Sequence, residues 1–514
     1  MSQFKKLASD TALYGISTIL GRLLNFALVP LHTYVFTKPG ALSSNVELYS
    51  YVGVLLTLYT LGLETTFFRF AARAKNDPVE QQRVFSDTLS IVILISGLAS
   101  TLIIALAPQI TSWLNYPGQQ SSIIWVSLII AIDAIVAIPF ARLRVENKAR
   151  QFVIAKITNI VLAVMLNVFF LIICRDIYSG KYLSVLQPFV RLFYNPAIGP
   201  GYIFLANLLA NATYFVLIRD AFRNFRFRVD KMAMGALVAY AFPLMLTNLA
   251  GLVNNTTDRI FLRHFLSEGF YDGISSADAL GIYGNCYKLS VFMALAIQSF
   301  KFAADPFFFS QAEDKNAPDL LASVTKWFLI VCTIIWVGAS LNLDVLGLLL
   351  SERYRVGLDI VPLLLLANLF LGVYYNISFW FKLSDKTKFG TFITAVGATV
   401  TILGNVVLIP IIGYMGCAVA FLASSFVMMA MCYVLGEKYY PVPYDVRSAA
   451  TYIIGAGLLI YVSWLFPIAN LWIAVPVHLS LCGLFVGVVL FIERDTFLPL
   501  VARLRKRGRP AAIR

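Results

Sequence analysis

The chain alternates long apolar stretches with short basic segments, and this alternation limits the folds that are open to it. Of its 41 Lys and Arg residues, 30 fall in eight short segments that separate about fourteen stretches of roughly 20 apolar residues. A stretch of that length spans the hydrocarbon core of a bilayer as one helix. The sequence therefore predicts an all-α polytopic membrane protein rather than a soluble domain.

The basic segments also predict an orientation. Short loops rich in Lys and Arg stay on the cytoplasmic side during insertion. They alternate here with loops that hold only seven of the 41 cations, so we expect both termini in the cytoplasm. The expected helices span about residues 8–36, 46–71, 84–107, 121–142, 151–174, 201–219, 235–263, 280–305, 319–342, 357–381, 389–413, 415–436, 448–467 and 470–492.

Two short patterns occur in both halves of the chain. Phe68–Ala72 ends the second expected helix, and the similar Phe300–Ala304 ends the eighth. A second echo follows the fourth and tenth helices, in residues 142–148 and 382–388. Parallel repeats of six helices place a substrate path between two lobes. We expect a first lobe at 1–220, a second at 221–436, two further helices at 437–493 and a basic tail at 494–514.

Several classes of function are disfavoured by what the sequence lacks. The net charge is +14, and most of the cations lie at the expected cytoplasmic helix ends. Anionic lipid rather than nucleic acid is the expected partner there. No phosphate-binding loop of the ATPase type is present. The three His and six Cys show no metal-ligand spacing, so we expect no metal and no cofactor. The external loop 175–200 is rich in Tyr, Phe and Leu, and is expected to lie on the membrane surface as an amphipathic segment.

Arg22 is the most informative single residue. It lies at the centre of the first helix, about 20 Å from either end, which is too deep for its side chain to reach the headgroups. A central Arg costs at least about 3 kcal/mol on insertion scales, so it is kept for a partner or a substrate. Arg22 either lines a cavity or forms a structural ion pair with Glu64 or Asp133. Its helix carries a polar stripe at a spacing of three or four: Thr11, Tyr14, Thr18, Arg22 and Asn25.

The seventh helix is expected to form a second wall of the cavity. After an expected kink at Pro243, the residues Asn248, Gly251, Asn255 and Arg259 share one face. Arg259 is next to Asp258, so a local pair, snorkelling and a substrate contact are all open.

The eighth helix adds Lys288 and, on the same face, Asn285. Several buried cations beside one path indicate an anionic substrate. A phosphate or diphosphate suits Arg because the guanidinium fork binds two oxygens. Three buried acids, Glu64, Asp133 and Asp258, are candidates for proton or sodium coupling, although each is equally suited to an ion pair.

These residues resemble a known family. The opening Thr11-Ala12-Leu13-Tyr14-Gly15-Ile16-Ser17, the run Gly21-Arg22-Leu23-Leu24-Asn25, Val29-Pro30-Leu31 and Glu64–Phe70 look like the polysaccharide-flippase branch of the multidrug/oligosaccharidyl-lipid/polysaccharide (MOP) exporter superfamily. The resemblance implies a flippase that moves a lipid-diphosphate-linked oligosaccharide, typically on undecaprenyl, from the cytoplasmic to the periplasmic leaflet by alternating access. Arg22 and Lys288 would hold the diphosphate. Relatives that carry peptidoglycan precursors have more arginines in the first, second and eighth helices than this chain.

The same resemblance implies a setting for the protein. We expect a multi-pass protein of the bacterial cytoplasmic membrane that acts as a monomer alongside glycan polymerase and glycosyltransferases. Two alternatives stay open: a drug or metabolite antiporter of the same fold, and a membrane-embedded glycan-modifying enzyme. A cavity that selects organic cations is expected to expose acids rather than buried cations, and an enzyme needs a buried His with acidic partners or a large external loop.

Overall fold

The structure is a computed structural model that describes residues 2–228, 230–310, 316–384, 386–468 and 470–494. Within these ranges, the side chains of 2–14, 16–18, 231, 233, 302, 303, 305–307, 309 and 310 are not described. The described residues form helices without a β-strand, and twelve helices are long and apolar enough to cross a membrane. Two shorter apolar helices cover Ile19–Val35 and Gly201–Leu217. The protein is therefore an all-helical multi-pass membrane protein, while the count of fourteen crossings stays a prediction.

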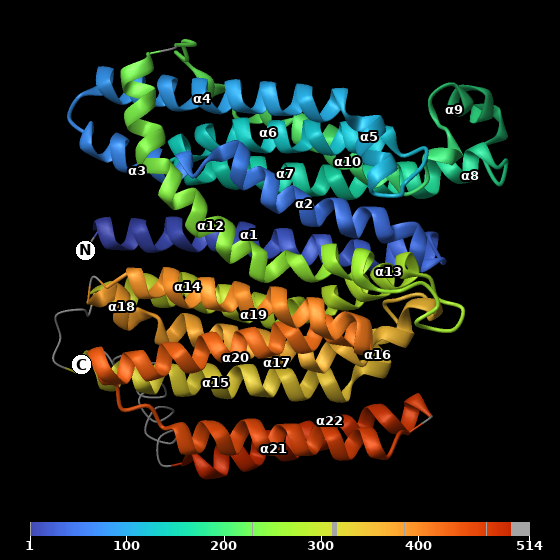
Figure 1. The fold of residues 1–514 in the computed structure, drawn as a ribbon, viewed down its shortest axis with the longest axis vertical. Coiled ribbons are helices and arrows are strands. Elements are labelled where there is room, and N and C mark those ends of the chain that lie inside the picture. The colour runs from blue at the N-terminus through green and yellow to red at the C-terminus, as the bar shows by residue number, and fades with distance from the viewer. Residues whose placement is uncertain (1, 229, 311–315, 385, 469, 495–514) are drawn as a thin grey trace, which may run out of the picture.

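The helices lie side by side in a bundle that is split into two lobes (Figure 1). We call the elements from α1 to η5 the first lobe. They are α1 (Ser2–Val35), η1 (Pro39–Leu42), α2 (Ser43–Thr60), α3 (Leu63–Arg73), α4 (Pro78–Ala105), α5 (Ala107–Trp113), α6 (Gln120–Val145), α7 (Ala149–Val168), η2 (Phe169–Cys174), α8 (Arg175–Tyr178), η3 (Ser184–Leu186), α9 (Gln187–Phe193), η4 (Pro196–Ile198), α10 (Gly201–Ala212), α11 (Tyr214–Leu217) and η5 (Arg219–Phe222).

The elements from α12 to α20 form the second lobe, and a helical pair follows it. They are α12 (Lys231–Phe265), α13 (Ser276–Tyr287), η6 (Lys288–Ser290), α14 (Val291–Ser310), α15 (Ala317–Leu341), α16 (Leu343–Gly347), η7 (Glu352–Gly357), α17 (Ile360–Ile377), α18 (Phe379–Leu383), α19 (Lys388–Ile412), α20 (Tyr414–Tyr439), α21 (Val446–Leu465) and α22 (Leu471–Ile492). Each predicted helical range overlaps elements of this series, because runs of about 20 apolar residues are a strong local signal.

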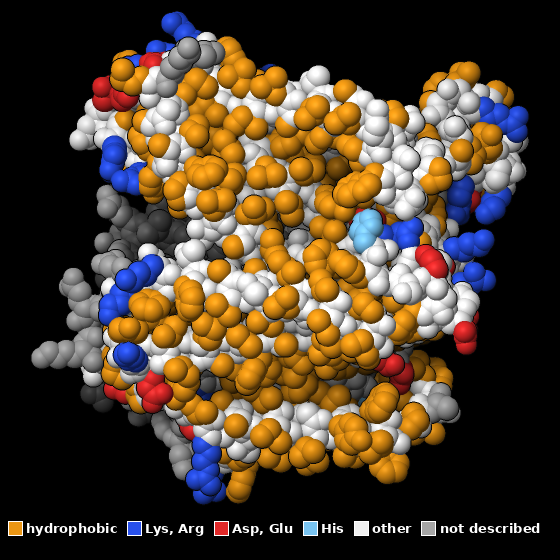
Figure 2. All heavy atoms as spheres, viewed as in Figure 1, with side chains coloured by type: hydrophobic (Ala, Val, Ile, Leu, Met, Phe, Trp, Pro, Cys, Tyr) orange, Lys and Arg blue, Asp and Glu red, His pale blue; other side chains and the backbone are white. Residues whose placement is uncertain are grey.

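Apolar side chains cover the flanks of the bundle, and Lys and Arg side chains gather at its two ends (Figure 2). This is the surface that a lipid bilayer requires, with an apolar band between two polar ends. We call the end at which α1 begins the proximal end, and the opposite one the distal end.

The seventh long helix, α12, connects the lobes. It runs obliquely from α3 and α4 of the first lobe toward α13 of the second (Figure 1). Pro243 lies inside it and removes a backbone donor, which accounts for a bend in a helix of this length. Gly62, at φ 75° between α2 and α3, packs against it, since a Cβ there would lie 3.2 Å from the carbonyl oxygen of Ala241. The first half of α12 thus packs against the first lobe.

The lobes meet closely at the distal end. The backbone nitrogen of Gly40 donates to the Asp278 carboxylate at 2.7 Å, and the Tyr354 hydroxyl donates to the carbonyl oxygen of Phe36 at 2.6 Å. Gly281 is required in this contact, because a Cβ there would lie 2.0 Å from the carbonyl oxygen of Pro39. These contacts join the lobes on the distal side.

Candidate functional site

A cavity of about 720 Å³ lies between α1 and the second lobe. We call it the central cavity. Its walls come from α1, α12, α13, η6, α14 and α17, so it is built from segments spread over most of the chain. Its charged lining residues are Arg22, Lys288 and Lys301, and none of its described lining residues is acidic. The central cavity is therefore a basic chamber in the middle of a membrane protein.

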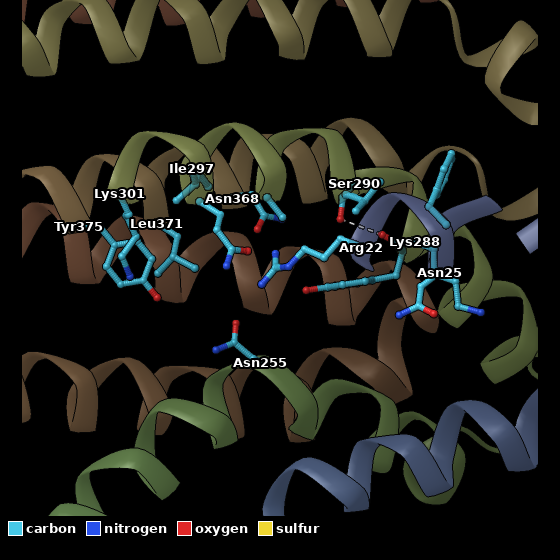
Figure 3. A pocket seen from close by; sticks show the side chains of 15 residues that line it. Arg22, Asn25, Asn255, Lys288, Ser290, Ile297, Lys301, Asn368, Leu371 and Tyr375 are labelled. Atoms are coloured by element: carbon cyan, nitrogen blue, oxygen red, sulfur yellow. Dashed lines mark hydrogen bonds between the residues drawn. The ribbon is translucent and has the colours of Figure 1, made fainter. Parts of the chain in front are cut away.

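Arg22 projects from α1 into this chamber, between Asn368 of α17 and Asn255 of α12 (Figure 3). It forms no ion pair or hydrogen bond with any described residue. The alternative of an ion pair with Glu64 or Asp133 does not occur, because both acids line a different cavity within the first lobe. The guanidinium thus stays available, with its five N–H donors, to a molecule that enters the cavity.

The other two cations of the central cavity, Lys288 and Lys301, each contact a neighbouring side chain. Lys288 lies in η6, where the eighth apolar segment changes from α13 to α14, and its Nζ donates to Asn285 Oδ1 at 3.1 Å. Lys301 lies on α14 with its Nζ 4.1 Å from the ring centroid of Tyr375. Figure 3 shows these two lysines on either side of Arg22 along the chamber. The arrangement spreads positive charge along the path rather than at one point.

Uncharged polar groups complete the lining. Asn255 donates from Nδ2 to the carbonyl oxygen of Gly251 at 2.9 Å, and Asn368 donates to that of Leu364 at 2.7 Å. Each bond satisfies the helix carbonyl four residues earlier and leaves the amide oxygen available. Gln298 also lines the chamber, and its Oε1 is buried without a hydrogen-bond partner among the described residues.

A second cavity of about 360 Å³ continues from the first toward the distal end. We call it the distal cavity. Asn25, Tyr287 and Lys288 line both cavities and so form the wall that they share. Arg259 lines the distal cavity, with its guanidinium carbon 3.9 Å from the ring centroid of Tyr287. Asp258 does not pair with it through its side chain: the carboxylate accepts from the Tyr283 hydroxyl at 2.6 Å and from the Arg259 backbone nitrogen.

A third cavity, of about 470 Å³, lies inside the first lobe, and we call it the first-lobe cavity. Glu64 and Arg144 form an ion pair there. Asp133 accepts from Asn211 Nδ2 at 2.9 Å. Lys156 also lies in this cavity, with its Nζ 4.4 Å from the ring centroid of Phe140. The cavity thus combines two acids and two cations away from the basic chamber.

The predicted substrate residues are brought together only in part. Arg22, Lys288, Asn25 and Asn255 line the central cavity, while Arg259 and Asn285 line the distal one. The Thr18 side chain lies outside the described residues. Asn248 is exposed and is not among the lining residues of the three cavities. It precedes Asn255 by two turns of α12, where the oblique course of that helix carries it away from the chamber.

Sequence reasoning missed other lining residues. In the sequence, Lys301 has the position of a cation at a cytoplasmic helix end. In the structure, it shares a face of α14 with Gln298 and Ala294, at spacings of three and four. Asn368 and Tyr375 follow a similar stripe on α17. This polar stripe in an otherwise apolar helix could have identified the side of α17 that lines the cavity.

The fold is shared with known transporters. Solved structures that resemble this chain include the lipid II flippase MurJ in an inward closed conformation, with a TM-score of 0.71, 14% identity, and coverage of 95% of this chain and 100% of that one. A mutant of the Vibrio cholerae MATE transporter VcmN gives a TM-score of 0.55 and 12% identity over 88% of this chain and 100% of that one.

The MATE multidrug transporter DinF-BH gives a TM-score of 0.57 and 15% identity over 84% of this chain and 95% of that one. The chain therefore shares its fold with these proteins. No protein-family model matches the chain, and no curated protein matches it. These similar structures are transporters and flippases rather than enzymes.

Proposed function

We propose that this protein is a transporter of the MOP type, and that it is a flippase for a polyprenyl-diphosphate-linked oligosaccharide, which it moves from the cytoplasmic to the periplasmic leaflet by alternating access. The observation that carries the proposal is the unpaired Arg22 in a chamber with Lys288 and Lys301 and without a described acid. A diphosphate supplies several anionic oxygens to such a set of donors, and the planar guanidinium binds two of them at once.

The charge of the central cavity favours this substrate over an organic cation. A cavity for a cationic drug is expected to place acids along the path, because an unpaired cation at membrane depth repels a second one. Asp258 and Glu47 line neither the central nor the distal cavity, and they accept hydrogen bonds from the Tyr283 and Tyr116 hydroxyls, respectively. Export of a drug or metabolite is kept as the alternative outcome of the experiment below.

The closed distal side supports a conformation that is open to substrate from the proximal, cytoplasmic side. In alternating access the two lobes rock about a fixed binding site. On this proposal, breaking the contacts of Gly40 and Tyr354 across the distal end would release the glycan to the periplasm.

An ion gradient is the proposed source of energy, with a proton or sodium ion as the coupling ion. Asp133 is the first choice for the coupling group, since its described hydrogen bond comes from a neutral amide, Asn211. Glu64 pairs with Arg144, and Asp258 is bonded to Tyr283, so both are better suited to structural roles. An acid that is buried beside a cavity can take up and release an ion at neutral pH.

The decisive experiment is flipping of a fluorescent undecaprenyl-diphosphate oligosaccharide by the purified protein in proteoliposomes, with and without a proton or sodium gradient. Transport that depends on the protein supports the flippase. Absence of flipping for several glycans, together with gradient-driven efflux of a cationic dye, would replace this proposal with the drug or metabolite exporter. We place the protein in the bacterial inner membrane, as a monomer that works alongside glycan polymerase and glycosyltransferases, with anionic lipid at its basic proximal loops.

A further inference from the structure

The distal cavity differs from the central cavity in its chemistry. Its lining holds five asparagines, together with His32, Tyr49 and Ser50. The asparagines are Asn25, Asn45, Asn167, Asn207 and Asn285. Since His32 follows Arg22 by ten residues, it lies about 15 Å farther along α1 toward the distal end. The distal cavity also contains two cations, Arg259 and Lys288. Along the path, the lining therefore changes from a chamber with three cations to one in which amides and hydroxyls outnumber the cations.

Asn45 indicates that this chamber is built for a ligand. Its side chain is 6% exposed, and its Nδ2 donates to the carbonyl oxygen of Pro200 at 3.2 Å. Its Oδ1 is buried without a hydrogen-bond partner among the described residues. A buried amide oxygen without a donor costs about 1–3 kcal/mol, so such groups are usually paired with water or a ligand. Asn45 thus leaves an acceptor unused in the lining of the distal cavity.

The other amides are oriented by the helices that carry them. Asn167 and Asn285 donate to the carbonyl oxygens of Ala163 and Gly281, four residues earlier on their own helices. Their amide oxygens are used by His32 and by Lys288, respectively. Asn207 donates to the Tyr49 hydroxyl. The lining is held in place by its own hydrogen bonds, which lowers the cost of ordering it around a ligand.

A ligand that fits this lining is rich in hydroxyl groups. Each sugar hydroxyl both donates and accepts, and amides and phenols offer the same two functions in return. The wall shared with the central cavity, formed by Asn25, Tyr287 and Lys288, adjoins the basic chamber directly. In a lipid-linked glycan, the first sugar is attached to the diphosphate without a spacer. The order of the two cavities matches the order of these two chemical groups.

We infer that the distal cavity binds the first sugar of the glycan while the central cavity holds the diphosphate. The inference rests on the proposed function and adds to it a separate sugar subsite, which includes Asn45 and the Tyr49 hydroxyl.

The test compares two probes on the purified full-length protein by native mass spectrometry: undecaprenyl diphosphate, and undecaprenyl diphosphate that carries one N-acetylglucosamine. We expect the wild type to bind the glycosylated probe about tenfold more tightly, the equivalent of one or two hydrogen bonds. Asn45→Leu, which keeps the branching at Cγ but removes both hydrogen-bonding groups, is expected to remove most of that preference without weakening binding of the bare diphosphate. Tyr49→Phe keeps the ring and is expected to remove part of the preference for the glycosylated probe.

Asn248→Leu, an exposed amide on α12 that lines none of the three cavities, serves as the matched control and is expected to bind both probes as the wild type does. Equal wild-type affinity for the two probes overturns the sugar subsite while leaving the flippase proposal intact. The same holds if Asn45→Leu and Tyr49→Phe weaken both probes equally. Failure of the folded wild type to bind either probe overturns the flippase proposal, and the subsite with it.

Discussion

Glu47 of α2 and His264 of α12 form a hydrogen bond of 3.1 Å between Oε1 and Nε2. Glu47 is completely buried and also accepts from the Tyr116 hydroxyl at 2.7 Å. The ring of Trp113 stacks on that of His264. Since α2 and α5 belong to the first lobe and His264 lies at the distal end of α12, this group of side chains holds the lobes together where the path is closed.

Glu47→Gln is expected to weaken this closure, because an amide with one acceptor oxygen replaces the carboxyl group that is hydrogen-bonded to Tyr51, Tyr116 and His264. A loss of about 1.4 kcal/mol corresponds to a tenfold larger open population. The measurement is the rate at which a membrane-impermeant maleimide labels Asn207→Cys in the distal cavity, applied from the periplasmic side. Glu268→Gln is the matched control, since Glu268 bonds to Ser276 and Arg263 within the second lobe. Equal rates in wild type and Glu47→Gln would contradict the closure role.

Asp133→Asn is expected to abolish stimulation of flipping by an ion gradient while leaving gradient-independent flipping in place. The amide keeps the hydrogen bond with Asn211 but cannot bind and release a proton or hold a cation. Glu146→Gln is the control, because Glu146 pairs with Arg142 and Lys148 in a loop outside the first-lobe cavity. Persistence of full stimulation in Asp133→Asn would show that the coupling ion binds elsewhere.

Lys326→Met is expected to loosen α21 and α22 from the bundle. Lys326 Nζ contacts Glu493 Oε1 at 2.5 Å and Asp445 Oδ2 at 3.0 Å. Hydrogen bonds from Ser448 and Lys326 lower the pKa of Asp445 to about 2. The Glu493 side chain is 4% exposed, so the loss of its partner costs up to about 3 kcal/mol. The loss of stability is measured by thermal unfolding in detergent, and Lys438→Met, at an exposed position, is the control. Unchanged stability of Lys326→Met would refute the expected role of Lys326.

The segment η3–α9 is expected to lie in the periplasmic membrane surface. Val185, Phe189 and Leu192 share one face and are 89%, 65% and 82% exposed, while Val190 on the opposite face is buried. An apolar helical face beside the membrane band is covered best by lipid. Tryptophan fluorescence of Leu192→Trp should be quenched by brominated lipid, and that of Lys181→Trp should not. Absence of quenching at both positions would place the segment in water and contradict this prediction.

The helices could be predicted from the sequence because each apolar run is long enough to span a bilayer by itself. Arg22 could be assigned to a cavity for a similar reason. A cation at the middle of a 34-residue helix is too costly to expose to lipid, so it faces protein or a cavity. The same logic failed for Lys301. A lysine near the end of an apolar run satisfies the rule for cytoplasmic loops, and the chamber beside it exists only when α14 and α17 are packed together.

Glu47 shows a second limit. Its partners Tyr116 and His264 are 69 and 217 residues away, so no local pattern connects them. Near the end of an expected helix, a glutamate is typical of a solvated interface. Its burial follows from the contact between the lobes, and that contact is a property of the tertiary structure.

Arg22 is proposed to bind the diphosphate of a lipid-linked glycan. The most direct measurement compares flipping of the fluorescent undecaprenyl-diphosphate oligosaccharide by wild type, Arg22→Ala and Arg150→Ala in proteoliposomes of equal protein content. Arg150 is an exposed cation of α7 that lines none of the three cavities. We predict that Arg22→Ala abolishes flipping while Arg150→Ala retains it; flipping at the wild-type rate by folded Arg22→Ala would contradict the account.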